Sequence, residues 1–338
     1  MLKIDFCSSE QVDSVMKFID NYWKKDHILS LLKELIDYQH LDKKNKRYNF
    51  VIAYSNNKIE GLLGFIPSSK YEENNHSFLW LSLWKTIPSA SPQLGLKLLS
   101  FLEKEVPHKI IGTLGISEEA FKIFKILRYK TGTLNHYYIP NPTIKNYSVC
   151  KDPIIKYIDA MDNTNNILEL NELDVFVDSY SFIPKRTVKY AKNKYEKHPF
   201  YKYTFLYFDK LNLILVTRAI EVNNKKILRI VDAIGQQSNI YKTASLLTSY
   251  IIKHNFEYVD LLNYGLDEQL MQKSGFTKLF PDSKTIIPMY FEPFIKNNSV
   301  IRYAYKYKGN CLENNVFLYK ADADQDRPNV IKNYNGEK

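Results

Sequence analysis

The hydrophobic pattern in the first half of the chain predicts alternating strands and helices. Apolar residues recur three and four positions apart between residues 10 and 41, which indicates a helical stretch with a break near Asp26. Strand-like runs on either side of Ser55-Asn-Asn-Lys58 predict a hairpin. In chain order we expect strand 2–7, helix 10–41, strands 48–54, 59–66 and 77–85, helix 93–104, strand 108–116, helix 117–128 and strand 132–139.

The second half repeats this order of elements after a stretch rich in Pro and Asn. Residues 140–166 break the periodicity and carry turn signals, which predicts a domain connection. Beyond it we expect a basic helix within 183–202, strands 202–208, 213–222 and 226–233, helix 239–253, strand 258–263, helix 266–275 and strand 285–291. The expected fold class is α/β (α+β), with a domain at 1–145, a connection at 146–166 and a domain at 167–338. Each domain is expected to be a mixed, mostly antiparallel sheet flanked by helices.

Length and composition agree with two cores of ordinary size. The chain has 338 residues, of which 45% are hydrophobic. No run of about eighteen apolar residues occurs, and the first residues enter an alternating strand without a signal peptide. We therefore expect a cytoplasmic protein with no membrane partner. The three cysteines stand singly, at 7, 150 and 311, which argues against a disulfide framework and a structural zinc site.

The positive charge is concentrated in one stretch. The formal net charge is +10, and seven Lys or Arg residues fall within 183–202. This stretch is either a solvated helix face or a surface that binds phosphate. Nucleic acid is not expected as a partner, because no zinc finger, RNP signature or Gly-rich basic tail accompanies the stretch.

The order of elements resembles the GNAT acyltransferases, once in each half. The helix of the second half ends in Gln272-Lys-Ser-Gly-Phe276, similar to the family's Tyr-x-Lys-x-Gly-Phe. Several strings resemble a two-domain subgroup encoded with surface-polysaccharide genes: Leu63-Gly-Phe-Ile-Pro67, Leu81-Ser-Leu-Trp-Lys85, Gly115-Ile-Ser-Glu118, Leu134-Asn-His-Tyr-Tyr138 and Lys320-Ala-Asp-Ala-Asp-Gln-Asp-Arg-Pro-Asn329. That resemblance implies transfer of an acyl group, such as 3-hydroxybutanoyl, from acyl-CoA to a dTDP-linked 3-amino-3,6-dideoxyhexose for O-antigen, lipopolysaccharide or capsule synthesis.

The resemblance also locates the coenzyme. GNAT proteins hold its pyrophosphate on free backbone amides at a helix N-terminus. The family's Gln/Arg-x-x-Gly-x-Gly/Ala maps onto Ala90-Ser-Pro-Gln93-Leu-Gly95, where only the last glycine is kept, and the second half has no glycine in Gln236-Gln-Ser-Asn-Ile-Tyr241. We therefore expect acyl-CoA in the first half, against Leu83, Trp84, Lys85, Gln93, Gly95 and Leu96. Alternatively, Gly95 is kept small only for packing.

The catalytic groups are less distinct. The tyrosine that GNAT enzymes often place on the last helix is replaced by Phe124 and by Met271, but a thiol with a pKa of about 8.5 leaves without an acid. His136 and Asp324 are the candidate bases, because imidazole titrates near neutral pH and the terminal string concentrates carboxylates. His136 is alternatively a buried hydrogen-bonded residue.

The acceptor side is expected in the second half. Lys185 or Arg186 would meet a diphosphate, and Tyr190 would stack on the nucleobase. In the terminal string, the predicted substrate contacts are Asp326, Arg327 and Asn329. The same string is alternatively a capped turn. It lacks the Gly and Glu of an EF-hand loop, so no metal is expected.

Two other functions stay open. One is transfer from aminoacyl-tRNA to a cell-wall precursor, although no charged heptad hairpin is visible. The other is a non-catalytic GNAT-like binding protein. Either a monomer or a homodimer fits the sequence.

Overall fold

The computed structural model describes residues 2–56, 58–156, 167–175, 177, 182–291, 294–309 and 315–326. Arg327 and Asn329 lie outside the described residues. The chain forms two compact units, neither of which is a continuous stretch. The first comprises Met1–Thr131, Tyr303–Cys311 and Ala323–Lys338, and the second comprises Gly132–Arg302 and Leu312–Asp322.

The first unit contains a mixed sheet in the order β1-β3-β4-β5-β6-β17-β7, with β2 on β3. Its strands are β1 Lys3–Ser8, β2 Leu41–Asp42, β3 Arg47–Ser55, β4 Lys58–Pro67, β5 Phe78–Thr86, β6 Ile110–Leu114, β7 Lys130–Thr133 and β17 Arg302–Tyr307. Its helices are α1 Val12–Phe18, α2 Ile28–Leu31, α3 Lys33–His40, α4 Leu94–Glu105 and α5 Glu118–Ile126. Strands β5 and β6 pair in parallel, whereas β1 with β3, β2 with β3, β3 with β4, β4 with β5 and β6 with β17 pair antiparallel.

Each face of the first sheet is covered by different helices. Helix α4 buries Leu94, Leu98 and Leu102 in one cluster with Val51 of β3. Phe50 stacks instead on His40 of α3, with ring centroids 4.2 Å apart. Since successive residues of a strand point to opposite faces, α4 covers one face and α3 the other.

The second unit contains a sheet in the order β14-β8-β13-β12-β11-β10-β9, with β18 on β13. Its strands are β8 Asn135–Pro140, β9 Leu168–Leu170, β10 Thr204–Phe208, β11 Leu213–Val222, β12 Lys225–Gly235, β13 Phe256–Tyr264, β14 Thr277–Leu279 and β18 Leu318–Tyr319. Its helices are α6 Val188–Ala191, α7 Ala244–Lys253 and α8 Glu268–Lys273, and β15 Tyr290–Phe291 pairs with β16 Phe294–Ile295.

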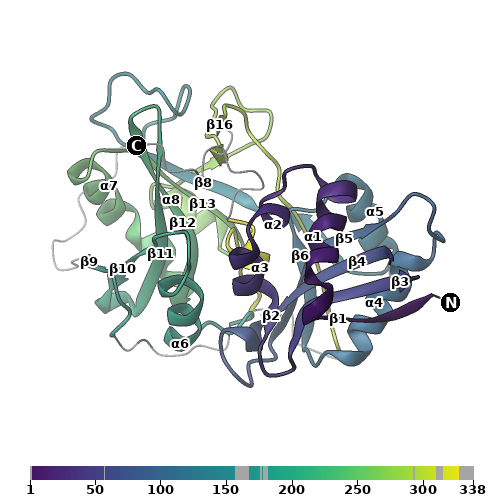
Figure 1. Ribbon diagram of the computed structural model, residues 1–338. Coiled ribbons are helices and arrows are strands. Elements are labelled where there is room, and N and C mark those ends of the chain that lie inside the picture. The colour runs from purple at the N-terminus through teal and green to yellow at the C-terminus, as the bar shows by residue number, and fades with distance from the viewer. Residues whose placement is uncertain are drawn as a thin grey trace. The chain divides into compact units, whose positions relative to one another are not determined.

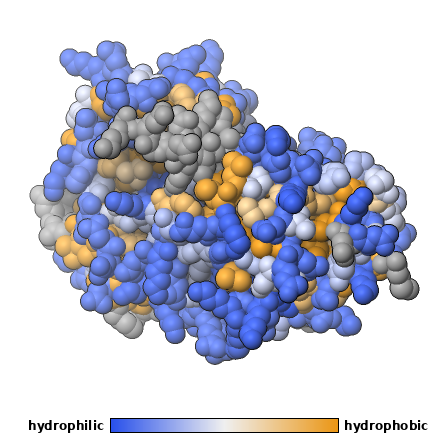
Figure 2. Space-filling view, in the orientation of Figure 1, coloured by the Kyte–Doolittle hydropathy of each residue, from blue (hydrophilic) through white to orange (hydrophobic). Residues whose placement is uncertain are grey.

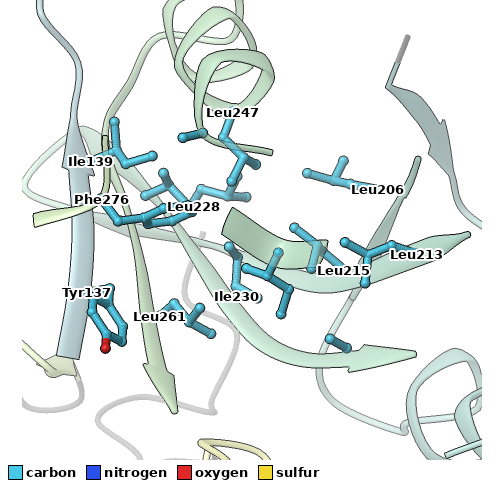
Figure 3. Close-up of a cluster of buried hydrophobic side chains, with 14 of the residues drawn as sticks. Tyr137, Ile139, Leu206, Leu213, Leu215, Leu228, Ile230, Leu247, Leu261 and Phe276 are labelled. Carbon is cyan, nitrogen blue, oxygen red and sulfur yellow. The ribbon is translucent and has the colours of Figure 1, made fainter. Parts of the chain in front are cut away.

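The core of the second unit lies between its sheet and α7. Figure 3 shows Leu247 of α7 directed at strand residues that include Leu228 of β12 and Ile139 of β8. Leu247 is fully buried, as are Ile230 and Leu261 on the same sheet. Both sheets, each flanked by helices, confirm the predicted fold class.

Two predicted strands differ in the structure. The stretch 132–139 was predicted as one strand, but it divides at Leu134 into β7 and β8, which join separate sheets. Figure 1 shows β8, blue like the first unit, beside green β13. The predicted strand 285–291 is mostly irregular, because Ile286 forms only an isolated bridge with Lys151 and β15 pairs outside the main sheet.

The face drawn in Figure 2 is mostly polar. Figure 2 shows a face on which hydrophilic residues predominate and hydrophobic ones form smaller areas. Among the described residues, no helix is long and apolar enough to cross a membrane.

Candidate functional site

Each unit contains a pair of parallel strands that part after a few residues. Strands β5 and β6 pair from Phe78 and Ile110 up to Leu81 and Thr113, and β5 then continues along β4 to Thr86. Strands β12 and β13 pair up to Ile230 and Leu261, and β12 continues to Gly235. We call these openings the first splay, beyond Leu81 on β5, and the second splay, beyond Ile230 on β12.

A β-bulge lies at the vertex of both splays. On β5 the register against β4 shifts so that Ser82 and Leu83 together oppose Gly64. On β12 the register against β11 shifts at Val231, directly after Ile230. A bulge turns backbone groups out of the strand ladder and is frequent beside active sites. At the vertex of a splay, a freed amide is suited to donate a hydrogen bond to a developing oxyanion.

The first splay is flanked by the start of α4 and by Trp84. No side chain caps α4 at Gln93, whereas Ser117 caps α5 and Asp267 caps α8. The first backbone N–H groups of a helix have no partner within the helix, so an uncapped start is suited to an anion. The indole Nε1 of Trp84 donates to the Gly95 carbonyl at 3.2 Å, and the ring packs 5.5 Å from Phe124.

The predicted coenzyme residues fall on these elements. Leu83 is buried, Trp84 is half-buried, and Lys85, Gln93 and Leu96 are exposed. A Cβ atom on Gly95 would lie 3.1 Å from Trp84 Nε1, so the tryptophan itself accounts for a small residue there. Packing against Trp84 is therefore sufficient to explain this glycine.

The α3 side of the first sheet carries buried polar atoms. Gln39 is 1% exposed, and within the described chain neither atom of its amide has a hydrogen-bond partner; the same holds for the Ser82 hydroxyl. A Cβ on Gly64 would lie 2.5 Å from Ser82 Oγ and 3.0 Å from the Phe50 ring. Gln39 and Ser82 therefore lie on the face of the sheet where His40 stacks on Phe50, next to the first bulge.

Asp324, a predicted base, lies in the first unit. Its carboxylate accepts a hydrogen bond from the Tyr71 hydroxyl at 3.0 Å. Next to it, the Gln325 side chain packs on Gly115, which directly follows β6. Burial lowers the pKa of Lys70 to about 8, an effect that the charge of Asp324 opposes. Asp326 is half-buried at the end of the described chain.

The second splay is filled by the chain itself. Strand β18 pairs with β13 at Asn263 and Tyr264, beyond the last β12–β13 pair. The Ala321 amide donates to the carbonyl of Val231, the bulge residue, at 3.0 Å. Lys194 Nζ donates to the Ala321 carbonyl at 2.8 Å.

Arg186 anchors this filling segment. Its side chain is fully buried between Asp232 of β12 and Asp322, with nitrogen–oxygen distances of 2.6 and 2.7 Å. It also donates to the carbonyls of Pro184 and Phe317. The protein therefore accounts for the Arg186 charge without a ligand. Of the neighbouring predicted contacts, Tyr190 is 2% exposed and Lys185 is exposed.

His136, the other predicted base, lies in the second unit. Its Nε2 is 2.9 Å from Asp260 Oδ2, and Arg229 donates to both oxygens of the same carboxylate. Burial raises the pKa of Asp260, but Arg229 and His136 lower it more, so the net shift is downward. His136 is 5% exposed, and its contact with Asp260 belongs to a buried network that includes Arg229.

Three residues beside the first splay were missed from the sequence: Gln39, Tyr71 and Ser82. Ser82 lies within the string Leu81–Lys85, which could have drawn attention to it. Gln39 is the one amide on the buried stripe of α3, a weak signal, and nothing in the sequence around Tyr71 distinguishes it.

Solved structures identify the fold. A GCN5-related N-acetyltransferase from Anabaena variabilis matches 91% of this chain and 73% of its own, with 12% identity and a TM-score of 0.54. A conserved protein of unknown function from Enterococcus faecalis, described as a probable N-acyltransferase, matches 91% of this chain and 72% of its own, with 9% identity and a TM-score of 0.52. No protein-family model matches the sequence, and no curated protein matches it. The chain therefore has the fold of GCN5-related N-acetyltransferases.

Proposed function

We propose that the chain is an acyl-CoA-dependent N-acyltransferase whose first splay holds the coenzyme. The observation that carries the proposal is the first splay itself: strands that part at a bulge, beside an uncapped helix start, in a GCN5-related fold. The pyrophosphate would lie on the amides of Gly95 and Leu96, with Leu83, Trp84 and Lys85 along the strand.

The chemistry needs few side chains. An uncharged amine attacks the thioester carbonyl carbon, and the carbon–sulfur bond breaks to release the coenzyme as a thiolate. The nitrogen loses one proton as the amide forms, and the thiolate takes up one proton, so the products are an amide and free coenzyme A. An amide of the bulge at Ser82 and Leu83 would donate to the oxyanion. Asp324 would accept the proton of the acceptor's ammonium group, while its bond from Tyr71 holds the carboxylate in place.

The acceptor in this proposal is the amine of a dTDP-linked 3-amino-3,6-dideoxyhexose. A buried polar atom without a partner costs about 1–3 kcal/mol, so Gln39 and Ser82 favour an acceptor that brings hydrogen-bonding groups. A sugar supplies hydroxyls in addition to the amine. Lys185 stays a proposed contact for the diphosphate, and Asp326, Arg327 and Asn329 stay proposed substrate contacts. Arg186 and Tyr190 already pack within the second unit.

A thiol-release assay tests this function. Acyl-CoAs of different chain length are offered with dTDP-sugars that bear the amine at C3 or C4, and we expect release that requires the C3 amine. Thiol release that ignores the sugar would contradict the acceptor. Aminoacyl-tRNA is an ester and yields no thiol, so a separate measurement of deacylated tRNA tests that donor, and its formation would favour the cell-wall function.

Paired variants test the base. We expect Asp324→Asn to lower kcat about 100-fold or more, because a base in proton transfer contributes roughly 10²–10⁴-fold. His136→Asn should change kcat much less and act mainly on stability. The reverse ranking would assign the base to His136.

A further inference from the structure

The second splay resembles the first in its backbone but differs in what lies within it. Both vertices carry a bulge, and both strand pairs are parallel up to that point. In the second unit, residues 315–322 run into the opening. Asn315 and Phe317 hydrogen-bond to Ile183, and β18 then pairs with the end of β13.

The segment is hydrogen-bonded to both strands of the second splay. Ala321 donates to Val231 at the bulge, and the Asn263 side-chain amide donates to the Leu318 carbonyl at 2.9 Å. The loop after β12 is also tied down, because the Gln236 amide donates to the Asn212 carbonyl and residues Gln237–Thr243 coil into a 3-10 helix before α7.

Side-chain hydrogen bonds hold the segment in place. Asp322 accepts from Arg186 and from the Tyr319 amide at 2.8 Å, and Lys194 holds the Ala321 carbonyl. Ala321 and Tyr319 are fully buried. A charge-assisted hydrogen bond is about twice as strong as a neutral one, so this anchoring opposes displacement of the segment.

We infer that residues 315–322 are a built-in occupant of the second splay, so the chain binds one coenzyme A, in the first unit. The inference rests on the proposed function only for the identity of the ligand. The occupation of the second splay stands on the contacts of β18 alone.

One preparation of the full chain serves both measurements that test it. Calorimetry with coenzyme A gives the number of sites, and amide exchange followed by mass spectrometry reports on residues 315–322 and 82–96. We expect one site per chain, exchange of 315–322 at least about 100-fold slower than in an unprotected peptide, and slowing by coenzyme A only within 82–96. Two sites per chain, faster exchange of 315–322 on adding coenzyme A, or unprotected amides there in the free protein would each overturn the inference.

The two proposals fail differently. If coenzyme A does not bind while 315–322 stays protected, the proposed function is wrong and the occupied second splay stands. Lys194→Met provides a milder perturbation than any change at Arg186: it should speed exchange of the Ala321 amide about 10-fold, because it removes one charged hydrogen bond. Lys189→Met, on an exposed residue of α6, is the matched control. Equal exchange at Ala321 in both variants would contradict the anchoring role of Lys194.

Discussion

The two splays have the same strand pairing and the same bulge, but they carry different side chains. Counting from each vertex, Leu83 of β5 corresponds to Asp232 of β12, and Trp84 corresponds to Ala233. In the first unit these two positions therefore carry apolar side chains, one of them a half-buried indole. In the second unit the position of Leu83 carries a carboxylate that pairs with Arg186.

These substitutions explain why, within the part of the chain that the structure describes, a segment fills the second splay and none fills the first. A buried carboxylate requires a cation and hydrogen-bond donors, and Arg186, Tyr195 and the Ala233 amide supply them to Asp232. Arg186 also pairs with Asp322, which anchors the segment. The first unit has no charge at that position, and within the described chain no strand pairs with the open edge of β5 beyond Leu81. A repeated fold can thus keep its backbone and lose a site through one ionisable side chain.

The largest expected effect is on the second splay. Arg186→Met should lower the free energy of unfolding by about 3–5 kcal/mol, because Asp232 and Asp322 would be left buried without their cation. Urea unfolding followed by circular dichroism measures it, with Lys189→Met as control. A loss below about 1 kcal/mol would show that the network does not hold the second splay closed.

The sequence predicts the order of elements well where periodicity is strong. The hairpin at residues 55–58 is confirmed, since β3 ends at Ser55 and β4 begins at Lys58. So is the break near Asp26, whose φ is +55°. Strands β17 and β18 were missed. The run Arg302–Tyr307 alternates tyrosines with other residues and could have been recognised, but β18 is too short to show any period.

The sheets that β8 and β17 join could not be predicted in the same way. Strand β8, from the end of the first half of the sequence, joins the sheet of the second unit, and β17, from the second half, joins the sheet of the first. Alternation indicates a strand but not its partner, and one residue, Leu134, separates strands of different sheets. Among the site residues, Arg186 offered a usable signal. It is the only Arg in a Lys-rich stretch, and Arg suits buried ion pairs better than Lys. The sequence alone did not separate this role from diphosphate binding.

A smaller effect is expected in the first splay. Trp84→Ala should raise the KM for acyl-CoA about 10–100-fold, equal to about 1.4–2.8 kcal/mol, because the indole flanks the start of α4. The KM for the acceptor should change little. Trp23→Ala, on a tryptophan that is 42% exposed, is the control. An unchanged KM for acyl-CoA would remove the main difference proposed between the two splays.

The smallest effect concerns the polar side of the first unit and depends on pH. Burial lowers the pKa of Lys70 to about 8, below its unfolded value of about 10.4. Below pH 8 the ammonium is charged in both states, so folding bears the cost of burying it. Above both pKa values the amine is neutral in both states and this cost disappears.

Lys70→Met should therefore be more stable than the unchanged protein at pH 7, by about 1–2 kcal/mol after allowance for the half-exposed side chain. The difference should shrink as the pH rises from 8 to above 10. Urea unfolding at pH 7, 9 and 10.5 measures it, and Lys85→Met, on exposed β5 sequence, should show no such trend. If the difference in the free energy of unfolding did not change with pH, Lys70 would not be desolvated. Water would then screen its ammonium charge from Asp324.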